Sequence, residues 1–308
     1  MYTMTNYCKE VFGEKLYKVA IDGGFTCPNR DGTLGTRGCI FCSAAGSGDF
    51  AGSRRLSVTE QIDDGIRRIS SKMKSGGRYI AYFQAFTNTY APVSVLEPLF
   101  LEAVRHPQVA VLSIATRPDC LGEDVLALIA RLNAVKPVWV ELGLQTIHED
   151  TARYIRRGYP LSVYEQAMHD LKAIGVHVIT HVILGLPGED PGRMLETIDY
   201  LAAAENRTDG IKLQLLHILE GTDLAAAYKA GQIPTLSMED YLALLADCVR
   251  HLPKDMVIHR LIGDGPKKSL LSPLWSADKK RVLNTMNRYF QEHQVVQGSC
   301  CGSDTARS

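Results

Sequence analysis

Residues 18–42 read KVAIDGGFTCPNRDGTLGTRGCIFC, and this stretch decides which fold and which chemistry we expect of the chain. It begins with a short apolar run at residues 18–22, typical of a strand, and continues as a loop rich in Gly, Pro, Asn and Asp. The loop contains three cysteines with the spacing Cys27-x11-Cys39-x2-Cys42. Glycines in such a loop let the backbone wrap closely around a compact group. The stretch therefore predicts a strand that leads directly into a cysteine-ligated site.

The cysteine spacing alone leaves the identity of the bound group open. Three thiolates are one fewer than a closed tetrahedral zinc site or a fully cysteine-ligated four-iron cluster requires. A [4Fe–4S] cluster on Cys27, Cys39 and Cys42 would keep one iron with an open position, which is typical of a catalytic metal. A zinc knuckle would take Cys8, His106 or another residue as its fourth ligand. Three unrelated buried thiols are the third interpretation, because free cysteines are often buried.

Beyond this loop the chain repeats a short apolar run followed by an amphipathic stretch. The apolar runs are rich in Val, Ile and aromatic residues, and several lack strict alternation, as strands buried on both faces do. Six such βα units in a row predict a parallel α/β sheet that curls like part of a barrel. The predicted strands are residues 18–22, 79–86, 109–115, 138–144, 177–184 and 211–218. The predicted helices are residues 59–73, 93–105, 123–132, 162–174 and 192–204, and N-cap residues stand at Thr59, Asp190 and Ser237.

The periodicity weakens after residue 220, and we expect the architecture to change there. Residues 1–220 are predicted to form the partial barrel, and residues 221–296 a C-terminal α/β extension that packs on it. Within the extension, residues 237–250 and 278–292 predict helices and residues 256–262 predict a short strand. Residues 297–308 contain Cys300 and Cys301 and show no periodicity, which predicts a disordered tail.

Composition and charge exclude several classes of protein. The 308 residues include 34 Lys+Arg and 34 Asp+Glu, so no net charge draws the whole chain to nucleic acid or an acidic membrane. An apolar fraction of 45% excludes a disordered or collagen-like chain. No apolar run reaches the roughly 18–20 residues of a membrane helix, and the polar N-terminus does not resemble a secretory signal. We therefore expect a cytoplasmic protein with reduced cysteines and no membrane partner.

The cysteine loop resembles that of the radical S-adenosylmethionine (SAM) superfamily, in the branch related to the Elongator catalytic subunit 3. A long first cysteine spacing is typical of that branch. Residues 18–32 resemble more specifically the bacterial YtqA/YhcC family. The resemblance continues through residues 83–90, 115–119, 141–146, 185–189, 221–224 and 263–275, and so covers nearly the whole chain. It implies a partial (β/α)6 TIM-like barrel with the C-terminal extension, and a [4Fe–4S] cluster on Cys27, Cys39 and Cys42.

The second cofactor implied by the resemblance is SAM, which one electron from the cluster cleaves to a 5′-deoxyadenosyl radical. Phe41, inside the Cys-x2-Cys motif, would lie against the adenine. Gln145, at the end of the fourth strand, would point into the barrel near SAM. Arg157 would approach the methionine carboxylate, a task that suits a guanidinium. His181 stands where relatives often carry an Asp that contacts the SAM ribose.

The remaining SAM contacts are expected at the ends of the second and third strands. Relatives often have a glycine-rich segment after the second strand that binds the SAM amino group. Gln84, Thr87 and Asn88 stand there in this sequence as substitutes. Thr116 begins a Thr-Arg-Pro-Asp motif that matches the Elongator-3-like branch. The alternative interpretation of these residues is ordinary polarity at strand ends, and for His181 a buried core histidine.

The resemblance implies a radical SAM enzyme that acts on the wobble uridine of tRNA. The specific hypothesis is conversion of 5-carboxymethylaminomethyluridine to 5-aminomethyluridine, with an electron donor such as flavodoxin or ferredoxin. A radical SAM enzyme on another substrate is a second hypothesis, and a zinc-stabilised RNA-binding scaffold without catalysis is a third. Residues 263–268 would line the substrate mouth.

Binding of tRNA requires basic patches that neutralise phosphates. Three clusters are candidates, although each could equally be a solvated charged surface. The candidate residues are Arg153, Arg156, Arg157, Lys267, Lys268, Lys279, Lys280 and Arg281.

Overall fold

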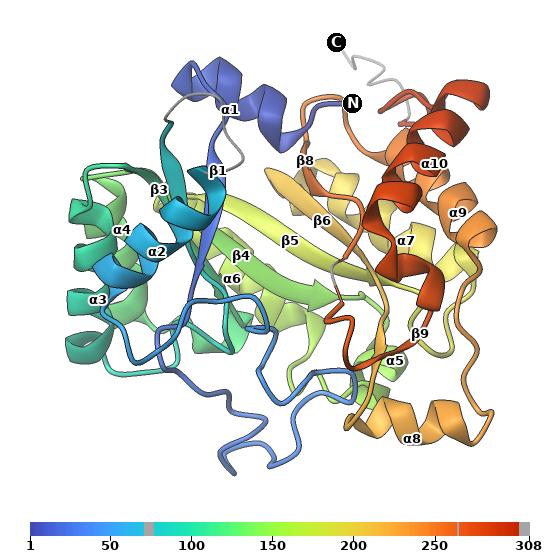
Figure 1. Cartoon of the computed structure of the whole chain (residues 1–308), viewed down its shortest axis with the longest axis horizontal. Helices are drawn as coiled ribbons and strands as arrows, with labels where there is room; N and C mark the ends of the chain where they lie inside the picture. Colours follow the sequence, from blue (N-terminus) through green and yellow to red (C-terminus); the bar gives the residue numbers. More distant parts are fainter. Residues whose placement is uncertain (71–76, 264, 302–308) are drawn as a thin grey trace.

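Seven parallel strands form one curled sheet at the centre of the molecule, in the order β1-β2-β3-β4-β5-β6-β8 (Figure 1). The computed structural model describes residues 1–70, 77–263 and 265–301. The strands are β1 (Tyr17–Ile21), β2 (Tyr79–Phe83), β3 (Val109–Thr116), β4 (Val138–Gln145), β5 (His177–Leu184), β6 (Gly210–Leu215) and β8 (Val257–Arg260). A separate antiparallel pair joins β7 (Ile218–Leu219) to β9 (Leu270–Ser272). The predicted fold class, a parallel partial barrel, is confirmed.

Most of the helices cover the outside of the curled sheet, whereas α1 and α8 lie at its two ends (Figure 1). The helices are α1 (Met4–Phe12), α2 (Val58–Ser70), α3 (Val93–Arg105), α4 (Glu123–Asn133), α5 (Glu149–Tyr154), α6 (Leu161–Ala173), α7 (Pro191–Ala202), α8 (Asp223–Lys229), α9 (Met238–His251) and α10 (Lys279–Glu292). Three short 3₁₀ helices lie at Pro118–Cys120, Ala204–Asn206 and Leu274–Ala277. Within the described ranges no helix is long and apolar enough to cross a membrane.

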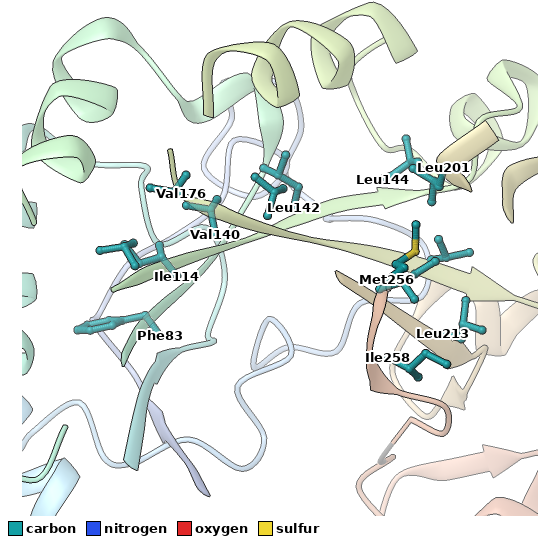
Figure 2. Close-up of a cluster of buried hydrophobic side chains, with 14 of the residues drawn as sticks. Phe83, Ile114, Val140, Leu142, Leu144, Val176, Leu201, Leu213, Met256 and Ile258 are labelled. Carbon is teal, nitrogen blue, oxygen red and sulfur yellow. The ribbon is translucent and has the colours of Figure 1, made fainter. Parts of the chain in front are cut away.

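The two faces of the sheet bury different kinds of side chain. On β4, Val140 and Leu142 belong to the large apolar core that the surrounding helices cover (Figure 2). The alternating residues Trp139 and Glu141 point into the curl, because successive side chains of a strand face opposite sides. The outer face therefore holds the core, and the inner face holds the side chains from which a site can be built.

An apolar layer closes the amino end of the curl. It contains Trp139 and the first inward residues of neighbouring strands, among them Ile80 of β2 and Val111 of β3. Cys8 of α1 is fully buried in the same cluster. Helix α1 was not among the predicted helices, although Thr3 and Asn6 form a capping box at its start.

The predicted C-terminal extension contributes a strand to the central sheet. β8 pairs in parallel with β6, with Val257 opposite Gly210, so the sheet has seven strands where six were predicted. The predicted strand 211–218 ends at Leu215, and residues 218–219 form β7 instead. The boundary at residue 220 stays a prediction, but the segments on its two sides share one sheet.

Two of the three predicted helix caps are confirmed. The side chains of Asp190 and Ser237 accept hydrogen bonds from the backbone N–H groups of Arg193 and Asp240. Thr59 is not a cap, because α2 already begins at Val58. Ser57 Oγ accepts a hydrogen bond from Glu60 N at 3.2 Å, and Glu60 Oε2 accepts one from Ser57 N at 2.7 Å. Residues 71–73, the predicted end of this helix, lie outside the described residues.

The prediction of a disordered tail is wrong for its first residues. Gln297 is 4% exposed, and its side-chain amide donates to Pro253 O at 2.7 Å and to Met256 O at 2.8 Å. Its Oε1 accepts a hydrogen bond from Tyr2 N at 2.6 Å. Cys301 Sγ donates to His251 O at 2.7 Å. Residues 302–308 lie outside the described residues.

Candidate functional site

The loop after β1 carries the three cysteines in tight backbone turns. Arg30 N and Asp31 N donate to Cys27 O at 2.8 and 3.2 Å. Cys42 N donates to Cys39 O at 3.0 Å. These turns fold the long spacing between the first two cysteines back on itself, so that Cys27, Cys39 and Cys42 line one cavity.

Distant segments hold this loop in place at the carboxyl ends of the strands. Ile40 N donates to Ile155 O at 3.2 Å, and Leu224 N donates to Ile40 O at 3.0 Å. Asn29 Nδ2 donates to Arg156 O at 2.7 Å. The loop is thus tied to the end of α5 and to the start of α8, which lie beside it at the same end of the molecule (Figure 1).

Gly38 allows the closest approach within the loop. Its φ is +74°, a conformation that residues with a side chain rarely adopt. A Cβ at this position would stand 2.9 Å from Arg30 Nε. Arg30 in turn donates from Nη2 to Cys42 O at 3.1 Å and to Ser43 O at 2.6 Å, so its position fixes the Cys-x2-Cys turn.

The donor set fits an iron–sulfur cluster. Burial raises the pKa of the Cys39 thiol to about 11, and burial also raises the pKa of Cys42. The raised pKa values favour the protonated thiols. Binding to a metal ion would favour the thiolates instead, because the cation stabilises their negative charge. Asn29 Nδ2 lies 3.4 Å from Cys39 Sγ and donates to it, as N–H groups do to the sulfurs of such clusters. Three soft sulfur ligands suit iron–sulfur chemistry.

The two fourth ligands named for a zinc knuckle lie elsewhere. Cys8 is buried in the apolar layer at the amino end of the curl. His106 follows α3, and its Nε2 bonds Asp63 Oδ1 at 3.1 Å. In the part of the chain that the structure describes, no three His, Cys, Asp or Glu side chains form a ready site for one metal ion.

The cavity at the cysteines is lined by residues at or just after six neighbouring strands of the central sheet, β2 to β6 and β8. Most of the predicted SAM contacts lie in its wall. Phe41, Gln84, Thr87, Thr116, Gln145, Arg157 and His181 line it. Phe41, Gln84, Gln145 and His181 also line a second cavity beside it, so the two spaces share a wall. The assignment of these residues to SAM stays a prediction.

Asn88 is the predicted contact that does not line either of these two cavities. It is fully buried, and its Nδ2 donates to Phe83 O at 3.1 Å and to Ala115 O at 2.8 Å. Both carbonyls belong to strand ends, so Asn88 holds the ends of β2 and β3 together. The Nδ2 group therefore has partners within the fold, whereas Oδ1 is buried without a hydrogen-bond partner among the described residues.

Arg157 lines the cysteine cavity, but its guanidinium is bonded to the protein. Nε donates to Tyr159 O at 3.0 Å, and Nη1 donates to Thr146 O at 2.6 Å. Nη2 faces Glu149 Oε1 at 3.4 Å. The side chain is 1% exposed. These contacts fix the chain after β4, and they occupy most of the donors that a carboxylate would need.

A polar layer lies beneath the predicted SAM contacts, and none of the sequence motifs indicated it. It takes one inward residue from each of the seven strands: Lys18, Tyr82, Ser113, Glu141, His181, Lys212 and Arg260. Parallel strands in a curled sheet contribute side chains to shared layers in this way. We call this set the polar layer.

Glu141 is the centre of the polar layer. Its Oε1 accepts from Lys18 Nζ at 2.5 Å and from Ser113 Oγ at 2.7 Å. Its Oε2 accepts from His181 Nε2 at 2.8 Å and from Lys212 Nζ. The side chain is fully buried, and four donors occupy the roughly four lone-pair directions of a carboxylate.

The charges of the polar layer follow from these contacts. Burial works to raise the pKa of Glu141, but Lys18 and Lys212 outweigh it and hold the pKa well below its usual range. Burial lowers the pKa of Lys212, but contact with the ionised carboxylate of Glu141 acts to raise it, and this ion pair keeps the ammonium protonated. Burial lowers the pKa of His181 to about 4. His181 is therefore neutral near pH 7 and carries its proton on Nε2, because an ionised carboxylate only accepts. Its Nδ1 can then accept from Gln214 Nε2, 3.4 Å away.

The second cavity lies at the open seam of the partial barrel. β1 and β8 are the two edges of the sheet. Lys18 of β1 and Arg260 of β8 line this cavity from the two edges, together with residues of α2 and of the cysteine loop. Gly265 and Pro266 of the predicted substrate-mouth segment also line it, whereas Asp264 lies outside the described residues. A molecule that enters the seam can therefore reach the wall shared with the cysteine cavity.

The candidate RNA-binding residues are mostly exposed. Exposed positions are Arg153 on α5, Lys267 and Lys268 before β9, and Lys279, Lys280 and Arg281 at the start of α10. Arg156 is bonded to Asp223 of α8, with Nη1 and Oδ2 2.5 Å apart. This contact lowers the pKa of Asp223 and joins α5 to α8.

The polar layer left a weak signal in the sequence. Lys212 is a charged residue in the middle of a largely apolar strand, and so is Glu141. A charge in a strand buried on both faces needs a partner, so each of the two implied a group of opposite charge elsewhere in the fold.

Comparisons with known proteins identify the family to which this chain belongs. Residues 32–201 match the family described as the radical SAM superfamily, and residues 208–292 match the radical SAM C-terminal domain. The chain is 46% identical over 297 residues to the uncharacterized protein YtqA of Bacillus subtilis, which covers 96% of this chain and 91% of that protein. It is 38% identical over 292 residues to protein YhcC of Escherichia coli K12, with 94% and 92% covered.

One more distant relative carries a name that includes tRNA. The chain is 30% identical over 197 residues to the tRNA uridine(34) acetyltransferase of Methanocaldococcus jannaschii, which covers 63% of this chain and 35% of that protein. Among solved structures, the archaeal Elp3 of Methanocaldococcus infernus has the same fold, with a TM-score of 0.70 at 17% identity. The match covers 92% of this chain and 64% of that one.

Proposed function

Because this chain belongs to the radical SAM superfamily, and is an enzyme that uses a [4Fe–4S] cluster and SAM, we propose that it modifies the wobble uridine of tRNA. The observation that carries the proposal is the pair of adjoining cavities, one at the cysteine loop and one at the open seam, which share lining residues above the polar layer. A uridine side chain that enters through the seam reaches the space beside the cysteines. The name of the more distant archaeal relative supports a uridine in tRNA as the target.

The bound cluster and SAM supply a 5′-deoxyadenosyl radical, which takes one hydrogen atom from the substrate. This chain's own residues position that reaction. Cys27, Cys39 and Cys42 would hold the cluster, and Phe41 and Gln84 lie in the wall between the two cavities.

The specific reaction that we propose converts 5-carboxymethylaminomethyluridine to 5-aminomethyluridine. Removal of a hydrogen atom from the carboxymethyl CH₂ leaves a carbon radical between nitrogen and carboxylate. Loss of one electron and one proton forms a C=N bond, water adds to its carbon, and C–N cleavage releases the amine and glyoxylate. The electron returned here balances the one consumed when SAM is cleaved. The first electron comes from a donor of the flavodoxin or ferredoxin class.

The exposed basic residues are proposed to bind the tRNA. Lys267 and Lys268 follow the segment that lines the seam cavity, and Arg153 lies on α5 beside the cysteine loop. The tRNA substrate also implies a cytoplasmic enzyme. With no net charge on the whole chain, the affinity for tRNA should be modest and should fall steeply with salt.

The test uses protein reconstituted anaerobically with iron and sulfide. It is given SAM, a reductant and tRNA that carries 5-carboxymethylaminomethyluridine, and nucleosides are then measured by mass spectrometry. We expect equal amounts of 5′-deoxyadenosine, 5-aminomethyluridine and glyoxylate. Cys39→Ala should bind no cluster and form none of the three. Iron-loaded protein that leaves the wobble nucleoside unchanged would contradict the proposal.

A small carboxylate-bearing metabolite is the second candidate substrate. The balanced charge of the chain and the pairing of Arg156 with Asp223 favour it over a large polyanion. Formation of 5′-deoxyadenosine that does not depend on tRNA, and that salt does not suppress, would identify this alternative.

A further inference from the structure

The polar layer contains more cations than anions. Two lysines, Lys18 and Lys212, contact one carboxylate, that of Glu141, and His181 adds no charge because it is neutral. Lys18 and Lys212 both touch Glu141, and both ammonium groups lie 4.5 Å from the centroid of the Tyr82 ring. Contact with an aromatic face partly offsets the loss of water around a cation. A ring supplies no formal negative charge, so the surplus of positive charge remains.

Glu141 has no capacity left for a ligand, whereas the lysines do. Its four acceptor directions are occupied by Lys18, Ser113, His181 and Lys212. An ammonium has three N–H donors. The hydrogen bonds of Lys18 use one of them, and those of Lys212 use two, the second to Tyr82 OH at 3.2 Å. The lysines therefore keep N–H donors for an anionic ligand, and Glu141 fixes where they stand.

Burial makes the surplus charge unfavourable until an anion arrives. The side chain of Lys212 is 4% exposed and that of Lys18 is 18% exposed. An incompletely compensated charge in such surroundings is costly, and a ligand with a negative charge removes the cost. A layer built in this way favours an anionic group over a neutral group of the same shape.

The lysines stand where the two cavities meet. Lys18 lines the seam cavity, and Lys212 lines the cysteine cavity. Tyr82, His181 and Arg260 line both. An anionic group bound by these lysines would therefore lie next to the cavity at the cysteines, at the inner end of the seam cavity.

We propose that Lys18 and Lys212 bind the carboxylate of the substrate and so select a substrate whose reacting carbon bears one. Glu141 is a positioning residue in this site, because it acts through the two lysines. The inference deepens the proposed function and rests on it for the identity of the substrate. The selection requires no bond to form or break.

The experiment compares two anticodon stem-loops that differ at one group. One carries 5-carboxymethylaminomethyluridine, and the other carries the corresponding carboxamide. The reconstituted enzyme should prefer the acid by tenfold or more in kcat/KM for 5′-deoxyadenosine formation. Lys212→Met and Lys18→Met should bring that ratio close to one, mainly through KM for the acid, while Lys212→Arg keeps most of the preference. Lys9→Met, on exposed α1, is the matched control and should keep the full ratio.

Two outcomes would overturn the inference, and a second variant covers the case in which the first does not fold. A preference for the acid that survives in both lysine variants overturns the inference. So does a tenfold loss of SAM affinity in Lys212→Met, since the lysines would then bind the carboxylate of SAM. If Lys212→Met does not fold, the double variant Glu141→Gln/Lys212→Met removes the buried pair together, and it should also lose the preference.

Failure of the proposed function gives a different result. In that case the wild-type enzyme processes neither stem-loop. The lysine site is then tested by NMR with N-benzylglycine against N-benzylglycinamide as probes. Binding of the acid alone, lost in Lys212→Met, supports the carboxylate site without tRNA, and equal or absent binding of both probes overturns it.

Discussion

Glu141 shows how one buried residue sets the geometry of several others. It joins side chains from β1, β3, β5 and β6, and it is fully buried. Breaking a buried ion pair on one side is strongly unfavourable, because the partner charge stays buried without compensation. At the scale of single residues, stability and substrate recognition therefore depend on the same carboxylate.

Replacement of Glu141 by Gln should lower the free energy of unfolding by about 3–5 kcal/mol. The amide keeps the shape of the side chain but leaves Lys18 and Lys212 without their common counter-ion. Urea unfolding of the metal-free protein measures the change. The double variant Glu141→Gln/Lys212→Met should recover part of the loss. A single variant within about 1 kcal/mol of the wild type would contradict the assigned role.

Stability should fall on mild acidification because three largely enclosed histidines resist protonation. Burial lowers the pKa of His181 from 6.5 to about 4, and it lowers the pKa of His177 and His259 in the same direction. The unfolded chain binds a proton near pH 6.5 and the folded chain does not, so the free energy of unfolding decreases as the pH falls from 6.5 towards 4. Each pKa unit contributes about 1.4 kcal/mol.

His181→Gln tests this sign. Its free energy of unfolding should change less than that of the wild type between pH 6.5 and pH 4, as measured by urea unfolding at several pH values. Exposed His169→Gln is the control and should leave the slope unchanged. Identical slopes for wild type and His181→Gln would mean that the imidazole titrates normally.

At the scale of elements, the cysteine loop depends on hydrogen bonds to α5 and α8 and on close contacts within itself. Gly38 and Gly32 both have positive φ, of +74° and +97°. Only at Gly38 would a Cβ meet other atoms, those of the Arg30 guanidinium, since nothing lies within 4 Å at Gly32. A substitution at Gly32 therefore introduces backbone strain alone, whereas one at Gly38 also displaces a neighbouring side chain.

Gly38→Ala should reduce iron binding on reconstitution more than Gly32→Ala does. Both substitutions introduce backbone strain of about 1 kcal/mol or more. Only Gly38→Ala displaces Arg30 from the carbonyls of Cys42 and Ser43. Iron content and the absorbance of the cluster after reconstitution measure the effect. Equal iron content in the two variants would show that Arg30 does not hold the Cys-x2-Cys turn.

At the scale of the whole molecule, the two ends of the described chain close one edge of the barrel. Thr3 forms a parallel bridge with Ile258 of β8, and Gln297 joins Tyr2 N to the carbonyls of Pro253 and Met256. The first residues of the chain and α10 lie near each other at this edge (Figure 1). The strand that carries Arg260 is thus held by both ends of the chain.

Gln297→Ala should lower the free energy of unfolding by about 1–3 kcal/mol, because it leaves two buried carbonyls and one N–H without their partner. Thermal or urea unfolding measures the change. Gln291→Ala, on the exposed face of α10, should alter stability by less than about 0.5 kcal/mol. A Gln297→Ala variant as stable as Gln291→Ala would show that the contact contributes nothing.

The parallel sheet and the cysteine loop could be predicted because their signals are local. The runs of Val and Ile in β3 and β5, and the glycines around Cys27 and Cys39, specify backbone conformation within a few residues. The family resemblance added the cofactors. The amino-terminal helix was missed because nine residues give little periodicity, and Gln297 because a single polar side chain carries no pattern.

The sequence by itself determined that this chain has a curled parallel sheet and three cysteines after its first strand. Only the tertiary structure decided which inward side chains meet. Lys18 and Lys212 stand 123 and 71 residues from Glu141, and no local periodicity records that pairing. The curl of the sheet brings them together, because strands at opposite edges face one another across its interior. The polar layer is therefore a property of the closed fold, although each of its residues is visible in the sequence.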